Sequence, residues 1–382
     1  MAETKTQYVP RILELAPVLE KKSVFLFGPR QTGKSALISH TLPDRRIYNL
    51  LESDTYLKLS RAPGRLREEC TGGERVVIID EIQKLPSLLD EVHMLIEERG
   101  IHFLLTGSSA RKLRRGGVNL LGGRARERRL FPFSYRELGA QFDLTRALNF
   151  GMIPSIYLSG EPEEDLESYV GAYLKTEIAD EGVTRNVPAF SRFFEVAAAC
   201  NGQMINYTNI ANDAQVARST VQEYFQILKD TLIAYELPAW KGSLKRKPLS
   251  TSKFYFFDTG VARFLQNRKV IAPGTPEFGA CFESYIFHEL TIYTEYKGQE
   301  PLSYWRSTSG YEVDFIVDGE TALEVKGTAH INPKDLKGLK ALRDEGKFRK
   351  YVVVCLETTP RVVDGIHIMP WRMALDELWS KA

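Results

Sequence analysis

The feature that most constrains this chain is a glycine-containing octapeptide, GPRQTGKS, at Gly28–Ser35. It directly follows a short apolar run rich in strand formers, SVFLF, and it precedes a helix-compatible stretch, ALISHTL. Glycines in such a loop let backbone N–H groups turn inward at a helix N-terminus and bind phosphate oxygens. Strand, loop and helix together predict a phosphate-binding loop rather than a turn that matches by chance.

The residues of this loop have separate expected roles. Lys34 is expected to reach the β- and γ-phosphates, and the Ser35 hydroxyl is expected to hold Mg²⁺. ATP and Mg²⁺ are therefore the predicted ligands. The other residues expected to surround the phosphates are Gly28, Pro29, Arg30, Gln31, Thr32 and Gly33.

Two further apolar runs end in polar residues. RVVIIDE suits a central parallel strand that ends in Asp80 and Glu81, at the edge of the sheet where ligands bind. Asp80 is expected to hold Mg²⁺ through water and Glu81 to orient the attacking water, although two acids can also simply end a strand in solvent. The run IHFLLT ends in Thr106 and leads into Ser108, close to where the γ-phosphate would lie.

Four stretches carry a family resemblance: GPRQTGKS, VVIIDEIQKLP, LLTGSSARKL and LLGGRARERRLFPFSYREL. Residues 8–160 resemble the AAA+ ATPases, and more narrowly the prokaryotic family whose AAA domain carries a C-terminal DUF4143 region. The resemblance implies that Thr106, Ser108 or Ser109 senses the bound triphosphate. It also suggests Arg124 as an arginine finger that acts on a neighbouring copy in a homo-oligomer. Alternatively, the arginines around Arg124 form a surface that faces DNA.

The resemblance extends to Gly151-Met-Ile-Pro154, which looks like the small lid motif that lies near adenine in related switch ATPases. An ATPase domain is thus expected at 1–160, followed by an acidic helical lid or linker at 161–190.

Residues 191–270 have the pattern of a winged helix. Two short helices meet at a turn near Gln215–Ala217, with Thr208 and Ser219 as expected N-caps. Two strands around a basic loop, KGSLKRKP, follow. The second helix would enter the DNA major groove through its first residues, and Lys245, Arg246 and Lys247 would contact backbone phosphates. The alternative is a module that binds proteins.

The C-terminal third, 271–382, places acids on facing strands. If Asp318–Glu320 forms a three-residue turn, Val317 faces Thr321 and Asp314 faces Glu324, with Lys326 on the same face. Carboxylates suit Mg²⁺ or Mn²⁺, and a neighbouring lysine can position water. The expected helix at 278–290 carries two acids, Glu283 and Glu289.

This Asp…Glu-x-Lys order resembles the PD-(D/E)XK nuclease fold, although Val313 stands where the family name has proline. The resemblance implies Asp314, Glu324 and Lys326 as catalytic residues, and Glu283, Asp314 and Glu324 as metal ligands. The alternative is a fold retained for its shape or for DNA contact without cleavage.

Composition sets the remaining expectations. The 382 residues suffice for two or three domains, and no apolar run reaches the roughly 20 residues of a membrane helix. Four scattered cysteines and a polar N-terminus indicate a cytoplasmic protein without membrane contact. The net charge of +2 excludes a uniformly basic nucleic-acid binder.

The expected fold is thus α/β: a P-loop AAA+ domain, a winged-helix domain and a C-terminal α/β restriction-endonuclease-like domain. The leading functional hypothesis is a Mg²⁺-dependent ATPase that engages DNA and couples nucleotide state to DNA remodelling or metal-dependent cleavage. The alternative is an ATP-gated regulatory switch whose two C-terminal modules bind proteins.

Overall fold

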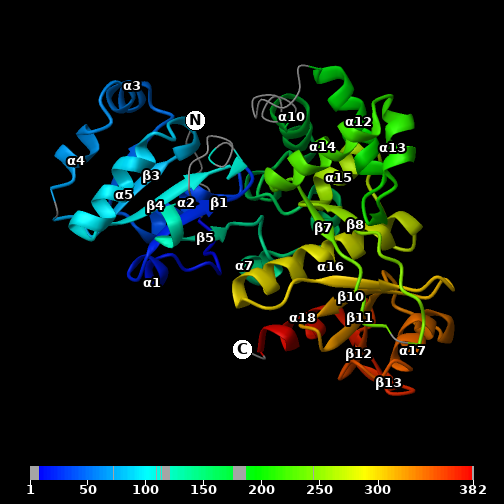
Figure 1. Ribbon diagram of the computed structural model, residues 1–382. Coiled ribbons are helices and arrows are strands. Elements are labelled where there is room, and N and C mark those ends of the chain that lie inside the picture. The colour runs from blue at the N-terminus through cyan, green and yellow to red at the C-terminus, as the bar shows by residue number, and fades with distance from the viewer. Residues whose placement is uncertain are drawn as a thin grey trace.

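The computed structural model of the chain contains three groups of elements (Figure 1). An α/β body comes first, a mostly helical middle region follows, and a second sheet forms the C-terminal part. The structure describes residues 8–71, 73–108, 110–111, 113, 121–174, 186–243 and 245–380.

The first group is built on a five-stranded parallel sheet with strand order β2-β3-β4-β1-β5. Its strands are β1 (Ser23–Phe27), β2 (Arg46–Asn49), β3 (Val76–Asp80), β4 (His102–Gly107) and β5 (Ala125–Arg129). Its helices are α1 (Ala16–Leu19), α2 (Lys34–Thr41), α3 (Ser53–Arg61), α4 (Arg65–Glu69) and α5 (Leu88–Arg99), with short 3₁₀ turns at Ile82–Lys84 and Leu121–Gly123.

Both faces of this sheet are covered, which explains its continuous apolar strands. Alternate residues of β1 enter two different cores: Phe25 packs towards α5, and Val24 packs towards Leu37 of α2. Because every strand runs the same way, the loops after β1, β3 and β4 meet at one edge of the sheet. The predicted nucleotide residues follow these three strands.

A run of short helices links the first body to the rest. It comprises α7 (Tyr135–Leu138), a 3₁₀ turn (Gly139–Gln141), α8 (Leu144–Phe150), α9 (Pro154–Tyr157), α10 (Pro162–Ser168) and a π-helical segment (Tyr169–Leu174). Within the predicted ATPase domain 1–160, α8 packs on α15 (Thr259–Leu265) and α16 (Pro276–Lys297) rather than on the parallel sheet. The acidic segment expected as a solvated lid buries Leu166, and residues 175–185 of it lie outside the described part of the chain.

The middle region confirms the expected helices, turn and strands. Helices α12 (Val187–Ala199), α13 (Tyr207–Ala214) and α14 (Arg218–Asp230) pack on a small antiparallel sheet of order β6-β8-β7. The strands are β6 (Gln203–Met204), β7 (Ala234–Leu237) and β8 (Lys253–Phe256).

The predicted helix caps were wrong by two residues at each helix. Asn206 caps α13, because its side-chain oxygen accepts hydrogen bonds from the amides of Thr208 and Asn209. Ala217 is the N-cap residue of α14, which places Ser219 inside the first turn. An asparagine forms this cap as well as a hydroxyl residue would.

The C-terminal part is a six-stranded mixed sheet with strand order β13-β14-β12-β11-β10-β9. Its strands are β9 (Ser303–Arg306), β10 (Glu312–Val317), β11 (Thr321–Val325), β12 (Lys350–Cys355), β13 (Arg361–Val363) and β14 (Ile366–Pro370), and its helices are α17 (Lys337–Arg343), after a 3₁₀ turn at Pro333–Leu336, and α18 (Trp371–Ser380). Val317 pairs with Thr321, as the hairpin arithmetic predicted.

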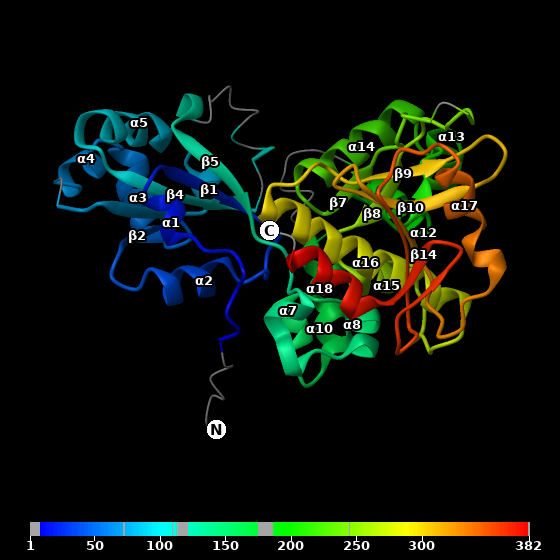
Figure 2. The same ribbon diagram turned by 90° about the horizontal axis from the view of Figure 1, so that it is seen from below.

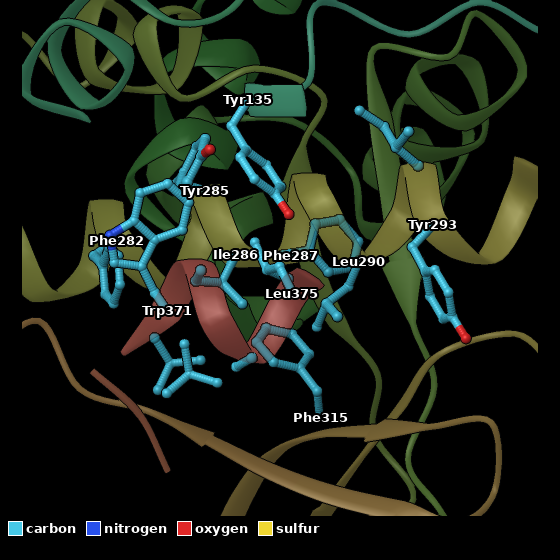
Figure 3. Packing of buried hydrophobic residues seen from close by; sticks show 14 of the residues in the cluster. Tyr135, Phe282, Tyr285, Ile286, Phe287, Leu290, Tyr293, Phe315, Trp371 and Leu375 are labelled. Carbon is cyan, nitrogen blue, oxygen red and sulfur yellow. The ribbon is translucent and has the colours of Figure 1, made fainter. Parts of the chain in front are cut away.

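One aromatic core joins the linking helices to the C-terminal sheet. Helix α16 runs between the middle region and this sheet, and Figure 3 shows its residues around Trp371 of α18 and Tyr135 of α7. Tyr135 and Trp371 meet edge to face at 5.4 Å between ring centroids. Figure 2 shows α7, α8 and α18 close together beside α16. Among the described helices, none is long and apolar enough to cross a membrane.

Candidate functional site

The phosphate-binding loop has the backbone that the sequence predicts. Only glycine fits at position 28, because a Cβ there would lie 2.4 Å from the carbonyl oxygen of Leu130. Gly33 adopts φ 91°, a left-handed conformation that favours glycine, and α2 begins at the next residue. The loop therefore ends at the N-terminus of a helix, where the backbone favours anions.

Lys34 closes the loop on itself. Its Nζ donates to the carbonyl oxygens of Gly28 at 2.7 Å and Pro29 at 3.1 Å, and its side chain is buried. The neighbouring Ser35 is exposed at the start of α2. A phosphate would be a stronger partner for this ammonium than either carbonyl is, because a phosphate is an anion.

The two acids lie at the end of β3, where Asp80 is the last residue and Glu81 follows it, and Thr106 of β4 lies between them and the loop. The Thr106 hydroxyl donates to Asp80 Oδ1 and accepts from the Glu81 amide at 3.1 Å. Because β4 separates β3 from β1, the end of β4 lies between the acids and the phosphate-binding loop. Thr106 thus holds both acids in place.

The backbone of Glu81 is strained, and its carboxylate accepts a hydrogen bond from a neighbouring side chain. Its φ is 61°, in the left-handed region that non-glycine residues rarely adopt, at a cost of roughly 1–3 kcal/mol. The Gln83 amide donates to Glu81 Oε2 and lies 3.5 Å from the Ser108 hydroxyl. Gln83 therefore connects the predicted base to a predicted sensor, a role that the sequence analysis missed. Ser109, the other sensor candidate, lies outside the described residues.

A cavity of about 260 Å³ lies beside Gly33. Six of the side chains around it are Tyr8, Val9, Ala36, Phe133, Pro154 and Leu158. Its mostly apolar walls and its position next to the loop suit a flat purine ring. Pro154 belongs to the predicted lid motif, whereas the contribution of Tyr8 and Phe133 could not be predicted, because no local pattern distinguishes these residues from ordinary core residues.

Arg11 fastens the N-terminal segment to this cavity. Its guanidinium donates to the carbonyl oxygens of Thr32 and Phe131, both at 2.6 Å, and forms an ion pair with Glu137 at 3.0 Å. Both members of this ion pair are almost fully buried. The cavity therefore has a rigid wall that includes the phosphate-binding loop itself.

The cavity is also tied to the middle region. Asp258, the N-cap of α15, accepts a hydrogen bond from the Met152 amide at 2.6 Å, and Met152 in turn bonds to the Phe133 amide at 2.8 Å. Burial raises the pKa of Asp258 to about 6. Gly151 must be glycine here, because a Cβ would overlap the Asp258 carboxylate.

Helix α16 holds the same segment from the other side. The buried His288 donates to the Phe133 carbonyl at 2.9 Å, and burial lowers the pKa of this imidazole to about 4. Glu289 accepts from the Tyr135 amide at 2.8 Å and the Ser134 hydroxyl at 2.7 Å. Both side chains thus fix the segment whose Phe133 lines the cavity.

Arg124 lies at the opposite edge of the sheet from the loop. The next residue, Ala125, pairs with Ser23 at the start of β1, whereas the loop follows the end of β1. Arg124 forms an exposed ion pair with Glu97 of α5. It therefore cannot reach the phosphate-binding loop of its own chain.

The C-terminal acids converge as the hairpin predicted. We use the name acidic cluster for Glu283, Glu312, Asp314 and Glu324. The Lys326 ammonium donates to Glu324 at 2.6 Å, and Asp314 accepts from the Val325 amide at 2.8 Å. Burial raises the pKa of Asp314 well above its ordinary value and that of Glu324 to about 7.

A second lysine, which the sequence analysis did not place here, enters this cluster. Lys253 of β8 lies 2.6 Å from Glu312, 3.4 Å from Glu283 and 3.9 Å from Asp314. In the described part of the chain, no three acidic, histidine or cysteine side chains are arranged to hold a metal ion. As arranged here, the acidic cluster does not fit a metal ion, although Glu283, Asp314 and Glu324 were predicted to bind one.

The basic loop, described at residues 241–243 and 245–248, contacts the C-terminal part of the chain. Lys245 donates to the Asp344 carbonyl, and its amide donates to Glu345. Arg246 forms an ion pair with Asp344 at 2.9 Å. That Lys245, Arg246 and Lys247 contact DNA phosphates stays a prediction, and Lys245 and Lys247 are exposed. Arg218, Ser219 and Gln222 at the start of α14 are also exposed.

Family models match three successive stretches of the chain. The matches are an AAA domain (AAA_14) at residues 20–139, a domain of unknown function (DUF8612) at 141–270 and a domain of unknown function (DUF4143) at 278–374. They support an AAA+ ATPase family with a DUF4143 region, and with it a nucleotide-dependent activity.

Two curated relatives are similar over most of the chain. An uncharacterized protein of Mycobacterium tuberculosis is 25% identical over 317 residues, which cover 81% of this chain and 69% of the relative. An uncharacterized protein of Methanocaldococcus jannaschii is 22% identical over 351 residues, which cover 83% of this chain and 76% of the relative.

Two solved structures are remotely similar. One is a signal transduction ATPase with numerous domains and a tetratricopeptide repeat sensor from Pyrococcus horikoshii. It is 14% identical, with a TM-score of 0.24, and the match covers 76% of this chain and 47% of that one. The other is the replication initiator DnaA bound to AMPPCP and single-stranded DNA. It is 13% identical, with a TM-score of 0.29, and the match covers 56% of this chain and 85% of that one. TM-scores this low carry no argument about this chain.

Proposed function

We propose that this chain is a Mg²⁺-dependent ATPase whose nucleotide state controls how it engages DNA. The observation that carries the ATPase proposal is the meeting of three strand ends at one edge of the parallel sheet. These ends bring the loop with Lys34, the pair Asp80 and Glu81, and the bridging Thr106 into one site.

Each residue of this site has a proposed role in hydrolysis. Lys34 leaves the carbonyls of Gly28 and Pro29 and binds the β- and γ-phosphates, while loop amides bind the remaining oxygens. Glu81 orients the attacking water and accepts its proton, and Gln83 positions the Glu81 carboxylate. Ser108 contacts the γ-phosphate. Because Gln83 connects Ser108 to Glu81, the position of the Glu81 carboxylate depends on whether the γ-phosphate is bound.

The residues beside the loop fit Mg²⁺, which prefers oxygen ligands. The Ser35 hydroxyl and the Asp80 carboxylate would hold it, because Ser35 is exposed at the start of α2 and Asp80 is only partly buried. Bound there, the ion would neutralise charge on the β- and γ-phosphates.

We propose that the active form is a homo-oligomer. Arg124 cannot serve its own site, because it lies at the opposite edge of the sheet. An arginine at that position can complete the site of a neighbouring copy by stabilising charge in the transition state.

We propose that the helix-turn-helix of the middle region contacts DNA as a winged helix, through the exposed start of α14. Arg218, Ser219 and Gln222 share this surface, and such residues contact phosphates and base edges. The exposed Lys245 and Lys247 of the basic loop would contact backbone phosphates beside α14. The four cysteines, none of them in a disulfide, support a cytoplasmic location.

A second candidate function is Mg²⁺- or Mn²⁺-dependent cleavage of DNA by a restriction-endonuclease-like C-terminal domain. The facing acids Asp314 and Glu324 beside Lys326 favour it. The Lys253 ammonium among the same acids opposes it, so we place cleavage second.

ATP hydrolysis measured with and without single-stranded, duplex and branched DNA, in Mg²⁺ or Mn²⁺, tests the proposal. We expect DNA to stimulate turnover and Lys34→Ala to abolish it. Turnover that depends on protein concentration but not on any DNA would instead support a regulatory switch whose C-terminal modules bind proteins. The same reactions run on a gel test cleavage, and any cutting should be lost in Glu324→Ala.

A further inference from the structure

We infer that Lys253 is the resident cation of the acidic cluster: it occupies the place that a divalent metal ion would take and joins the middle region to the C-terminal sheet. This inference is independent of the ATPase proposal. It concerns a contact between β8 and the strand and helix that carry the acids.

The geometry around Lys253 suits an ammonium group. Three carboxylates, of Glu312, Glu283 and Asp314, surround its Nζ at 2.6, 3.4 and 3.9 Å. A lysine has three N–H donors and no acceptor, so three acids around it match its capacity. The side chain is 5% exposed and its Nζ lies 5.3 Å from the ring centroid of Tyr304. The neighbouring acids raise the pKa of this lysine, so it remains charged.

The strand that carries Lys253 is held on both sides. Lys253 pairs with Leu237 of β7 and with Met204 of β6 in the small sheet. Two residues further along β8, the Tyr255 hydroxyl donates to Glu283 at 2.6 Å, and its ring stacks on Phe287 of α16. The backbone that carries Lys253 is therefore held rigidly beside the acidic cluster.

The segment between β7 and β8 reinforces this contact. Its backbone pairs with β9: the Trp240 amide donates to the Tyr304 carbonyl, and the Leu249 amide donates to the Arg306 carbonyl at 2.8 Å. The β9 edge of the C-terminal sheet is thus covered by the middle region. Withdrawal of the strand that carries Lys253 would require this whole edge to separate.

The remaining charges around the cluster leave little room for a metal ion. Lys326 binds Glu324, and Arg306 binds Glu312 at 3.1 Å. The cluster thus contains four carboxylates and, with Lys253, three cationic side chains. A divalent ion bound to Asp314 and Glu324 would lie beside two ammonium groups, and such like-charge contacts are unfavourable at low dielectric. Cleavage by this cluster would first require Lys253 to leave.

Mn²⁺ binding to the nucleotide-free full-length chain, measured from the electron paramagnetic resonance signal of free Mn²⁺, tests the inference. We expect wild type and Asp314→Asn to give the same binding curve, because the cluster of the wild type holds no Mn²⁺. Lys253→Met removes the charge and keeps the length, and should gain one Mn²⁺ site per chain, bound at least tenfold more tightly than any site of the wild type. Adding Asp314→Asn should remove it, and Lys253→Arg should not create it.

Two results would overturn the inference. One is a Mn²⁺ ion bound by the wild type and lost in Asp314→Asn. The other is a folded Lys253→Met chain that gains no Mn²⁺ site, since Lys253 would then not be what keeps the metal ion out. If Lys253→Met does not fold, the comparison between wild type and Asp314→Asn still decides.

Discussion

Arg111 forms an ion pair with Asp230 at 2.5 Å, which connects the segment after β4 to the end of α14. Arg111 is almost fully buried and lies three residues after Ser108. Just beyond α14, Leu232 joins the hydrophobic core of the ATPase sheet. The segment that would sense the γ-phosphate is therefore in direct contact with the helix proposed to bind DNA.

Asp230→Asn should uncouple these two regions. We expect basal ATP turnover within about twofold of wild type and loss of the DNA-stimulated increment, because the charged hydrogen bond that joins Arg111 to α14 is weakened. Asp213→Asn, at an exposed position of α13, is the matched control and should retain stimulation. Full stimulation in Asp230→Asn would show that the signal takes another route.

Glu81→Gln should separate binding from hydrolysis. The amide keeps the size of the side chain but cannot accept a proton, so turnover should fall by about 10²–10⁴-fold while ATP affinity is retained. Single-turnover hydrolysis and binding of a fluorescent ATP analogue measure the two quantities. Lys34→Ala should lose binding as well. A Glu81→Gln chain that hydrolyses ATP at the wild-type rate would exclude Glu81 as the base.

Features set by local sequence were predictable. The loop Gly28–Ser35 and the pair of Val317 with Thr321 follow from residue type, turn length and the two-residue repeat of a strand. Asp314 and Glu324 were brought together on the same grounds. The helix-turn-helix was visible as well, because apolar periodicity and turn signals are local.

Contacts between distant segments were not predictable. No local pattern marked Lys253 as a site residue, and only the fold places it among Glu312 and Asp314. His288 and Glu289 lie in an apolar helix, where their partners at Phe133 and Tyr135 leave no signal in the sequence. A charged residue in an apolar pattern indicates a buried partner but does not identify it.

Glu289 should make stability depend on pH. Burial raises the pKa of this carboxyl from 4.5 to about 7 in the folded chain, so the folded state binds the proton more tightly than the unfolded state does. This contribution is fully present below about pH 4.5 and is lost as the pH rises to 7, at up to about 1.4 kcal/mol per pH unit.

Glu289→Gln removes this titration, so its free energy of unfolding should fall less than that of wild type between pH 5 and pH 7. Urea unfolding at intervals across this range measures the difference. Glu277→Gln, at an exposed position on the same helix, should keep the wild-type slope. Identical slopes in wild type and Glu289→Gln would mean that Glu289 is already ionised in the folded chain at pH 5.

Arg124 should act on a neighbouring copy. Arg124→Ala is expected to lower turnover by about 10³-fold without loss of ATP binding, because an arginine finger stabilises only the transition state. Its partner Glu97 is exposed, so the ion pair between them contributes little to folding and the variant should remain folded. Arg126→Ala, at a neighbouring exposed arginine of β5, is the control and should retain activity.

Mixing two inactive variants gives the decisive test. Glu81→Gln supplies an intact Arg124, and Arg124→Ala supplies an intact site, so a mixed oligomer contains interfaces with both. Turnover should reappear on mixing and peak near equal proportions of the two chains. No recovery, in a mixture shown by cross-linking to contain both chains, would mean that Arg124 does not complete a neighbour's site, and would favour the alternative in which this arginine-rich strand faces DNA.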